Sequence, residues 1–287
     1  MESFELLAPQ IYRLQVPFPG DWTGVTLVRG EKNVLIDTGG CAETVDSVLV
    51  PALKELGLTL NDMDAVLLTH THGDHIGGLP RIRALAPHIH VAAYAPMADK
   101  VRNPLIYMKR IRGRFPGFSN PPSGSIAGCE PDILLNDGDK LYGYLRLIYT
   151  PGHDDDAVCF MDERCKAVIT GDSLQLNGTR SQGSALCMFV SDYLSSVDRL
   201  IAEKPEYIIA GHEYLPLGGY AKGEKDVSAY LMRCKELIEF YRGFVRGMQL
   251  AGNSDPAAIA RALIHEIGGE EPQKLCLPLY TVTQLMK

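Results

Sequence analysis

Long apolar runs are missing from this sequence of 287 residues. No stretch of roughly 18 apolar residues occurs, and a membrane-spanning helix requires such a stretch. The segment Met1–Glu5 also lacks the basic start and the apolar stretch of a secretory signal. We therefore expect a cytoplasmic protein that has no membrane partner.

Positive charge is in short supply. The chain has 28 Lys and Arg against 35 Asp and Glu, which gives a formal net charge of −7. A protein that binds nucleic acid over most of its surface needs an excess of basic residues on the contacting face. The composition therefore argues against a general nucleic-acid platform, while a local basic patch is still allowed.

Cysteine pairs and a serine nucleophile motif are also missing. The seven cysteines are widely spaced with no C-x-x-C motif, so we expect reduced and mostly buried thiols. The segment 171–173 does not complete the G-x-S-x-G motif, which excludes a serine hydrolase of that type. What remains is a globular chain whose 46% apolar residues can fill the core of one large domain, with or without an appended segment.

A dense cluster of metal-ligand side chains follows the apolar run Ala65–Leu68. It consists of His70, His72, Asp74 and His75, within six residues. An apolar run bounded by turn residues predicts a buried strand, so the cluster lies at the end of that strand. Imidazole and carboxylate are ligands that zinc prefers, whereas a solvated polar loop would not explain four of them in this spacing. We interpret the run as a metal-binding motif.

Three further candidate ligands follow strand-like runs later in the chain. They are His153 in Thr-Pro-Gly-His, Asp172 in Ile-Thr-Gly-Asp and His212 in Ile-Ile-Ala-Gly-His. Seven candidates exceed the ligand number of one tetrahedral zinc ion. Two ions about 3.5–4 Å apart would use all seven if one carboxylate bridges them, as in two-metal hydrolytic sites.

A further motif precedes these ligands, Asp37 in Leu-Ile-Asp-Thr-Gly. Together the motifs occur in the order found in metallo-β-lactamase-fold hydrolases. The chain resembles that superfamily over about residues 10–215, and its last 70 residues are similar to the helical tails of glyoxalase II-like and thioesterase-like members. The resemblance implies an α/β (α+β) fold, a four-layer αββα sandwich. It also implies that Asp37 supports the ligand loops from outside, because ligand imidazoles need their second nitrogen held.

The resemblance implies a role for each ligand. His70, His72 and His153 would hold one ion, Asp74, His75 and His212 the other, and Asp172 would bridge them. A hydroxide between the ions would attack an activated carbonyl, because zinc lowers the pKa of bound water to about 7. Asp74 would position that hydroxide and is the predicted catalytic residue. Zinc is the first candidate for the two divalent ions, and iron or manganese also suits these ligands.

The rest of the chain alternates between period-2 and helical patterns. We predict strands at 11–16, 25–28, 33–37, 65–68, 91–94, 141–149, 157–161, 167–170 and 207–210, and helices at 43–56, 79–85 and 195–201. Three more amphipathic stretches follow, at 227–248, 256–267 and 275–286. These patterns predict a catalytic domain at 1–217 and a helical extension at 218–287.

Residues 96–128 depart from this alternation and resemble a helical insertion. They carry six basic residues against Asp99 alone, a charge of +5, which leaves −12 for the rest of the chain. The basic residues are Lys100, Arg102, Lys109, Arg110, Arg112 and Arg114. The insertion is either a cap that grips an anionic substrate, since Arg suits phosphate geometry, or a solvated helix over a sheet edge. A loop is predicted at Pro121–Ser125.

Two features close to the ligands need interpretation. Asp154, Asp155 and Asp156 follow His153, where superfamily members commonly have a small or hydroxyl residue and a glycine. We interpret these carboxylates as outer support for the metal site, with direct ligation as the alternative. For Tyr214 we expect packing, with donation to a developing oxyanion as the alternative.

The predicted function is hydrolysis of an activated carbonyl, a thioester first and a lactone or other ester next. The partner would be a small and anionic, acyl-CoA-like molecule. A metal-dependent ribonuclease or phosphodiesterase would use the same ligands, and the basic insertion keeps nucleic acid as an alternative partner. A regulatory effector with weak thioesterase activity is the third prediction. The sequence does not indicate an oligomeric state.

Overall fold

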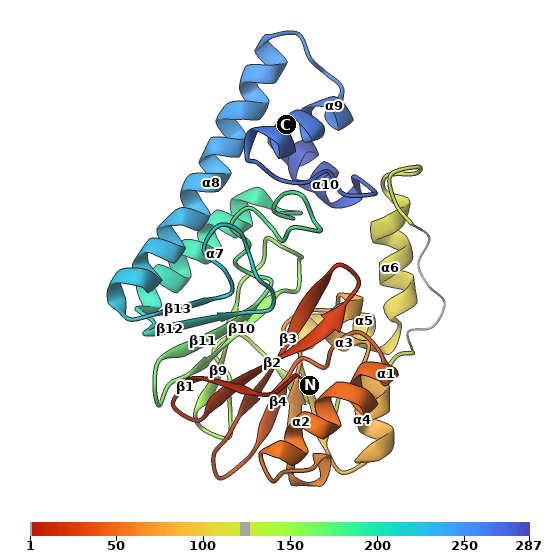
Figure 1. The fold of residues 1–287 in the computed structure, drawn as a ribbon, viewed down its shortest axis with the longest axis vertical. Coiled ribbons are helices and arrows are strands. Elements are labelled where there is room, and N and C mark those ends of the chain that lie inside the picture. The colour runs from red at the N-terminus through yellow and green to blue at the C-terminus, as the bar shows by residue number, and fades with distance from the viewer. Residues whose placement is uncertain (1, 121–126) are drawn as a thin grey trace.

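The structure, a computed structural model, describes residues 2–120 and 127–287. Two β-sheets form its middle, and helices cover them on both outer sides (Figure 1). The first sheet has the strand order β1 (Glu5–Ala8), β2 (Ile11–Phe18), β3 (Asp21–Val28), β4 (Val34–Ile36), β5 (Ala65–Leu67), β6 (His90–Tyr94) and β7 (Ile133–Leu135). The second has the order β13 (Tyr220–Lys222), β12 (Tyr207–Ala210), β11 (Ala167–Gly171), β10 (Val158–Asp162), β9 (Leu145–Tyr149) and β8 (Lys140–Leu141).

Each sheet contains parallel strands whose carboxyl ends meet at one edge. In the first sheet β1 to β4 are antiparallel and β4 to β7 are parallel. In the second sheet only β11 and β12 pair in parallel among the described strands. Parallel neighbours need a crossover, and a helix usually supplies it. The crossovers place the loops after β4, β5, β11 and β12 together.

Helices cover the outer face of the first sheet. They are α1 (Ala42–Thr44), the π-helical turn η1 (Val45–Leu49), α2 (Val50–Glu55), α3 (Gly73–Ile76) and α4 (Leu79–Leu85). The first three are continuous and account for the helix predicted at 43–56. The 3₁₀ turn η2 (Leu60–Asp62) precedes β5, and the 3₁₀ turn η3 (Ala95–Met97) follows β6.

The second sheet is apolar on both faces. Val158 and Phe160 of β10 join the core between the sheets, whereas Cys159 and Met161 of the same strand join a second core against helices. Successive side chains of a strand point to opposite faces, so one strand serves both cores. The predicted helix–sheet–sheet–helix sandwich is confirmed.

α7 (Val190–Glu203) and α8 (Glu224–Leu250) cover the outer face of the second sheet, and α9 (Pro256–Glu266) and α10 (Cys276–Leu285) pack on α8 beyond the ends of the strands (Figure 1). α8, α9 and α10 make up the predicted helical tail. Tyr230 and Ile238 of α8 share an apolar cluster with Val168 of β11. The domain boundary at residue 217 stays a prediction, and β13, which follows it, pairs with β12.

Two helices occupy the described part of the insertion, α5 (Ala98–Arg102) and α6 (Pro104–Gly113). The predicted loop at Pro121–Ser125 lies outside the described residues. α6 lies next to α5 on the side of the first sheet and extends toward α10 (Figure 1). Its far end contacts the tail, because the Tyr280 hydroxyl donates to the carbonyl of Ile111 at 2.8 Å and the Cys276 N–H donates to the carbonyl of Phe118 at 3.0 Å.

One strand prediction needs correction, and three strands were not predicted. The strand expected at 141–149 is a hairpin, β8 and β9, because Tyr142 (φ 50°) and Gly143 (φ 79°) adopt left-handed backbone and reverse the chain in three residues. The short strands β1, β7 and β13 were not predicted. No helix among the described residues is long and apolar enough to span a membrane. The seven cysteines are free thiols, and four of them are buried.

Candidate metal centre

All seven predicted ligands lie at the ends of four strands. His70, His72, Asp74 and His75 follow β5, while His153 follows β9, Asp172 follows β11 and His212 follows β12. The backbone joins these loops directly, since Val158 N donates to Thr69 O at 2.8 Å and Gly24 N donates to Gly211 O at 2.6 Å. The structure therefore brings all seven side chains to the junction of the two sheets.

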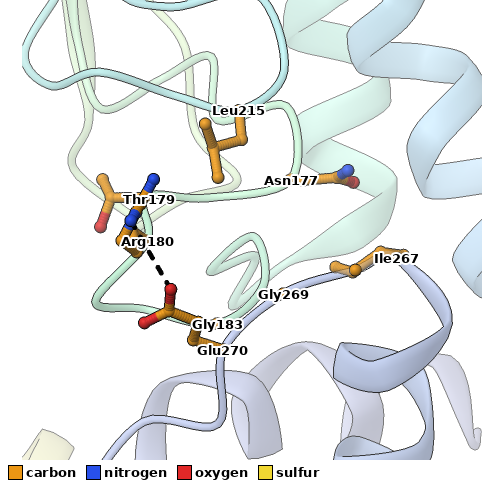
Figure 2. A pocket seen from close by; sticks show the side chains of 9 residues that line it. Asn177, Thr179, Arg180, Gly183, Leu215, Ile267, Gly269 and Glu270 are labelled. Carbon is orange, nitrogen blue, oxygen red and sulfur yellow. Dashed lines mark ion pairs between the residues drawn. The ribbon is translucent and has the colours of Figure 1, made fainter.

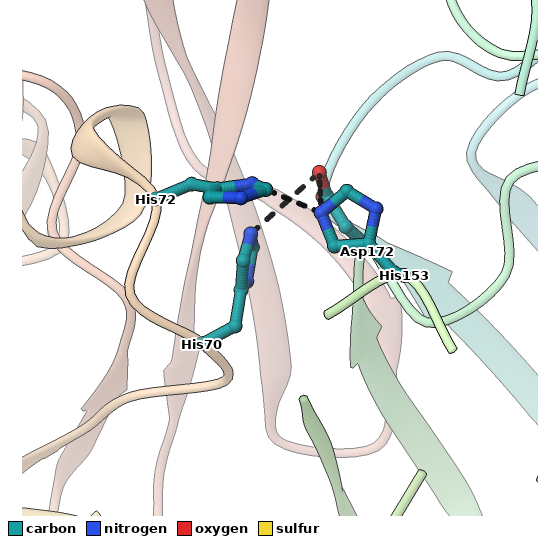
Figure 3. Close-up of side chains that lie close together, drawn as sticks. All are labelled: His70, His72, His153 and Asp172. Atoms are coloured by element: carbon teal, nitrogen blue, oxygen red, sulfur yellow. Dashed lines mark hydrogen bonds and ion pairs between the residues drawn. The ribbon is translucent and has the colours of Figure 1, made fainter. Parts of the chain in front are cut away.

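The first group contains His70, His72, His153 and Asp172, each offering one ligand atom within 4.8 Å of the others (Figure 3). Nε2 of His153 lies 3.0 Å from Nδ1 of His72. Oδ2 of Asp172 lies 3.5 Å from Nε2 of His153 and 3.8 Å from Nε2 of His70. The four side chains converge although they come from three separate loops.

The second group contains Asp74, His75 and His212. Nε2 of His212 lies 3.1 Å from Oδ2 of Asp74 and 3.3 Å from Nε2 of His75. Oδ1 of Asp172 lies 3.2 Å from Nε2 of His75 and 3.5 Å from Nε2 of His212. Because the two oxygens of Asp172 face different groups, this carboxylate stands between them.

The outer nitrogens of three imidazoles are held by hydrogen bonds. His212 Nδ1 donates to the carbonyl of Trp22 at 2.6 Å, and His153 Nδ1 donates to the carbonyl of Leu186 at 3.1 Å. A carbonyl only accepts, so these Nδ1 atoms carry the hydrogen and each Nε2 keeps its lone pair for the site. His75 Nδ1 makes the corresponding bond to Asp37 Oδ2 at 2.8 Å.

Asp37 also holds the start of the ligand loop. Its carboxylate accepts from the Thr69 N–H at 2.9 Å and from the Thr69 hydroxyl at 2.7 Å. Asp37 itself is 2% exposed. The predicted support of the ligand loops therefore has a geometric basis, since one carboxylate fixes both the loop and the ring of His75.

The donor atoms fit divalent cations. Nε2 of His70 and Oδ1 of Asp172 are buried and have no hydrogen-bond partner among the described residues. Buried polar atoms are normally satisfied, and a cation at each group would satisfy these. Burial, followed by the neighbouring His153, lowers the pKa of His72 to about 3. Burial also opposes charge on His212, yet Asp172 and Asp74 raise its pKa to about 9, so the carboxylates draw positive charge to the site.

Glycine is required where the loops meet. A Cβ on Gly211 would lie 2.7 Å from Oδ1 of Asp172 and 2.9 Å from Cε1 of His75. Gly211 N also donates to Gly171 O at 2.8 Å. Any larger residue at this position would therefore push two candidate ligands apart.

Gln175, which was not predicted, is fully buried beside the first group. Its Nε2 lies 2.9 Å from Nδ1 of His153 and 3.5 Å from Oδ2 of Asp172, and its Oε1 accepts from the N–H of Leu186 at 2.7 Å. A single amide in an apolar stretch gives no motif. Gln175 Nε2 also donates to the hydroxyl of Tyr214 at 3.3 Å, so this buried tyrosine packs inside the network.

The three aspartates after His153 form a group of their own around Lys100. The side chain of Asp154 lies beside a predicted ligand, with Oδ2 at 3.6 Å from Nε2 of His72. That His72 nitrogen is not the one that faces His153. The aspartates therefore lie outside the two ligand groups.

A separate hollow of about 100 Å³ lies beside the loop after His212 (Figure 2). Asn177, Thr179, Leu215 and the α9–α10 connection at 267–270 line it, and Arg180 crosses it to pair with Glu270 at 3.6 Å. None of the seven candidate ligands lines this hollow. It marks the place where the tail packs on the loop after β11.

The chain is similar to a known family and to several known proteins. Residues 19–212 match the family model of the metallo-beta-lactamase superfamily. Lactamase-like protein vrtG of Penicillium aethiopicum is 30% identical, over 68% of this chain and 54% of that protein. An atrochrysone carboxyl ACP thioesterase of Claviceps purpurea is 25% identical, over 71% and 56%. Hydroxyacylglutathione hydrolase of Francisella tularensis subsp. novicida is 26% identical, over 68% and 64%.

The fold is similar to that of solved structures. A metallo-beta-lactamase family protein from Thermus thermophilus superposes with a TM-score of 0.72 and 23% identity, covering 96% of this chain and 92% of that one. The chain spans about half the length of the first curated relatives it matches. The match to the family model covers more than half of the chain and includes all seven candidate ligands, so the chain belongs to the metallo-beta-lactamase superfamily.

Proposed function

We propose that this chain is a two-metal hydrolase of small thioesters, with zinc as the first candidate metal. The superfamily consists of metal-dependent hydrolases, and the two adjoining ligand groups joined by Asp172 are the observation that carries the proposal. Bound divalent ions would supply Lewis acidity and lower the pKa of water to near 7. The chain's own residues would hold the ions, position the water and recognise the substrate.

Asp74 is the ligand best placed to position the attacking water. Its side chain is 16% exposed, whereas that of Asp172 is 4% exposed. The Thr23 hydroxyl donates to Oδ2 of Asp74 at 3.0 Å and fixes the carboxylate. On the open side of the site, Asp74 is therefore an oriented acceptor for the proton of a water molecule.

The names of two relatives support a thioester. One is called an ACP thioesterase, and the other a hydrolase of hydroxyacylglutathione, in which the acyl group is carried on a thiol. A thioester carbonyl is activated enough for attack by ionised water without a protein nucleophile. Lactones and other esters share this reactivity and are the next substrate class in the proposal.

The insertion supplies a place for an anionic carrier. Tyr107 of α6 contacts the site, its hydroxyl 3.4 Å from Nε2 of His72. Further along α6, Lys109 and Arg112 line a hollow of about 310 Å³ with Gly117 and Ser119. Five residues of helix rise roughly 7–8 Å and turn by about 140°, so Arg112 lies about that far along the axis from Tyr107 and on another side of α6. In this proposal the carrier passes around α6, with the acyl group near Tyr107 and a phosphate near Arg112.

The ribonuclease alternative is weaker than the sequence suggested, because half of the basic residues in the insertion are paired within the chain. Lys100 pairs with Asp155, Arg102 pairs with Glu130, and Arg110 also faces Asp155. Among the described residues, only Lys109, Arg112 and Arg114 of the six form no ion pair. Three cations suit one phosphate group better than a track of phosphates. The regulatory-effector alternative shares the same site and stays a prediction.

The test is a substrate panel with the zinc-loaded full chain. It contains a short acyl-CoA, a hydroxyacylglutathione, a phosphate-free acyl thioester of N-acetylcysteamine, a lactone, a phosphodiester and a short RNA. We expect thiol release from the thioesters, and Asp74→Asn should lower it by at least about 100-fold, the usual contribution of proton-transfer groups. Arg112→Gln should raise KM for acyl-CoA and leave KM for the phosphate-free thioester unchanged. Turnover of the phosphorus esters alone would overturn the proposal.

A further inference from the structure

The insertion reaches the metal centre through a group of charged side chains, here named the Lys100 cluster: Lys100, the buried Asp154 and Asp156, and the exposed Asp155. Nζ of Lys100 lies 3.1 Å from Oδ2 of Asp156 and 3.6 Å from Oδ1 of Asp154, and it also contacts Asp155. The Lys100 side chain is 16% exposed, and those of Asp154 and Asp156 are 0% and 2% exposed. A helix of the insertion thus places its ammonium group directly behind the loop of His153.

The Lys100 cluster sets three carboxyl groups against one ammonium group, and burial raises the pKa of Asp154 and Asp156. Its other polar neighbours include Arg110, 3.7 Å from Oδ2 of Asp155, the Thr71 hydroxyl, which donates to Oδ2 of Asp156 at 3.1 Å, and the Asp155 N–H, which donates to Oδ1 of Asp154 at 2.7 Å. Oδ2 of Asp154 and Oδ1 of Asp156 are buried and have no hydrogen-bond partner among the described residues. A buried polar atom without a hydrogen bond is costly, so we expect one of these oxygens to meet a further donor.

His72 is the candidate for that donor. Its ring is turned the opposite way to those of His153, His75 and His212, because its Nδ1 faces Nε2 of His153 at 3.0 Å. Nε2 of His72 therefore points away from the ligand group, toward the insertion. There it lies 3.6 Å from the free Oδ2 of Asp154.

The ring of Tyr107 forms the other wall around His72. It stacks on the imidazole with centroids 6.1 Å apart, and its hydroxyl lies 3.4 Å from Nε2. Nζ of Lys100 lies 4.3 Å from the centroid of the same tyrosine ring. The ammonium group of Lys100 therefore contacts both Asp154 and Tyr107, the two neighbours of His72 Nε2.

We infer that Lys100 and Asp154 are positioning residues of the metal centre, which goes beyond the proposed substrate class but rests on the proposed binding of metal. Lys100 holds Asp154 with Oδ2 toward Nε2 of His72. Asp154 accepts the Nε2 hydrogen and keeps Nδ1 directed into the ligand group, as carboxylates do for ligand histidines elsewhere. The insertion thereby completes the metal site from outside.

The experiment measures metal binding of the full chain, by competition with a chromophoric chelator and by the visible spectrum of the cobalt-substituted protein. Its variants are Asp154→Asn, Lys100→Met and the double variant. Arg102→Met is the control, since Arg102 lies on the same helix but pairs with the exposed Asp99 and Glu130. Far-UV circular dichroism and thermal unfolding of the metal-free proteins report whether each variant folds.

We expect Asp154→Asn and Lys100→Met to weaken one of two metal equivalents by about 10–100-fold and to change the cobalt spectrum, whereas Arg102→Met does neither. Because Lys100 acts through Asp154, the double variant should bind metal no more weakly than Asp154→Asn. Unchanged binding in folded single variants, or strictly additive losses, would overturn the inference. A third metal equivalent in Lys100→Met would overturn it too, since the aspartates would then be ligands. If the wild-type chain binds no metal, the proposed function itself fails.

Discussion

Asp37 is the residue on which the order of the ligand loop depends. It is the acceptor for three donors, the Thr69 N–H, the Thr69 hydroxyl and Nδ1 of His75. Its backbone has φ 62°, a left-handed conformation that Asp and Asn adopt more readily than other residues with a side chain. Asn at this position would therefore keep the backbone but lose the charge and one acceptor oxygen.

We predict that Asp37→Asn lowers metal affinity by about 10–100-fold, the usual effect of losing an outer partner of a ligand histidine. The loss should appear at the ion held by His75. Chelator competition on the purified variant measures it. Asp46→Asn is the matched control, because Asp46 is half exposed and pairs with Arg81 on the surface. Equal affinities for the wild type and Asp37→Asn would contradict the prediction.

Glycine decides how closely the turn between α3 and α4 approaches the rest of the molecule. A Cβ on Gly77 would lie 1.9 Å from the carbonyl oxygen of Gly40, and one on Gly78 would lie 2.4 Å from that of Thr38. By contrast, a Cβ on Gly247 of α8 would meet nothing within 4 Å. The same substitution should therefore have opposite effects in the two elements.

We predict that Gly77→Ala lowers the free energy of unfolding by at least the roughly 1–3 kcal/mol that overpacking costs. Gly247→Ala should raise it by up to about 1 kcal/mol, because alanine loses less backbone entropy in a helix. Urea denaturation of the two variants and the wild type gives both values. A destabilised Gly247→Ala variant would show that this face of α8 is covered in solution.

At the scale of the whole molecule, the metal centre joins the two sheets. His70 to His75 belong to the first sheet, whereas His153, Asp172 and His212 belong to the second. Bound cations would act as cross-links between the layers, in addition to the backbone hydrogen bonds such as Gly24 to Gly211. Ligand binding to the folded state alone stabilises a protein by mass action.

We predict that removing the metals lowers the midpoint of thermal unfolding. A site held at 100 times its Kd contributes about 2.7 kcal/mol, so two such sites contribute about twice that amount. Calorimetry with and without a chelator measures the shift, and a chelator saturated with zinc beforehand is the control. Re-addition of zinc should restore the midpoint, and an unchanged midpoint after complete removal would contradict a cross-linking role.

The sequence alone determined the strands, helices and motifs of this protein, because these depend on residues that are close together in the chain. The apolar run before His70 and the helical spacing at 43–56 led to a strand and a helix close to the predicted positions. The spacing of His70, His72 and His75 indicated a metal site. Two features that can be read from the sequence led to this prediction: the type of each residue and its place just after a strand. The hairpin at 142–144 was missed because Tyr142 leaves no signal in an apolar pattern, and Gly143 beside it was the one turn signal in that stretch.

Only the tertiary structure decided which outer groups complete the centre. His72 turns its Nδ1 inward, the Trp22 carbonyl holds His212 from 190 residues away, and Lys100 enters the cluster of Asp154 from the insertion. The sequence predicted a basic insertion but did not show which of its cations are paired inside the chain. Local patterns carry no record of such partners, because a hydrogen bond between distant residues depends on how the two sheets and the insertion pack.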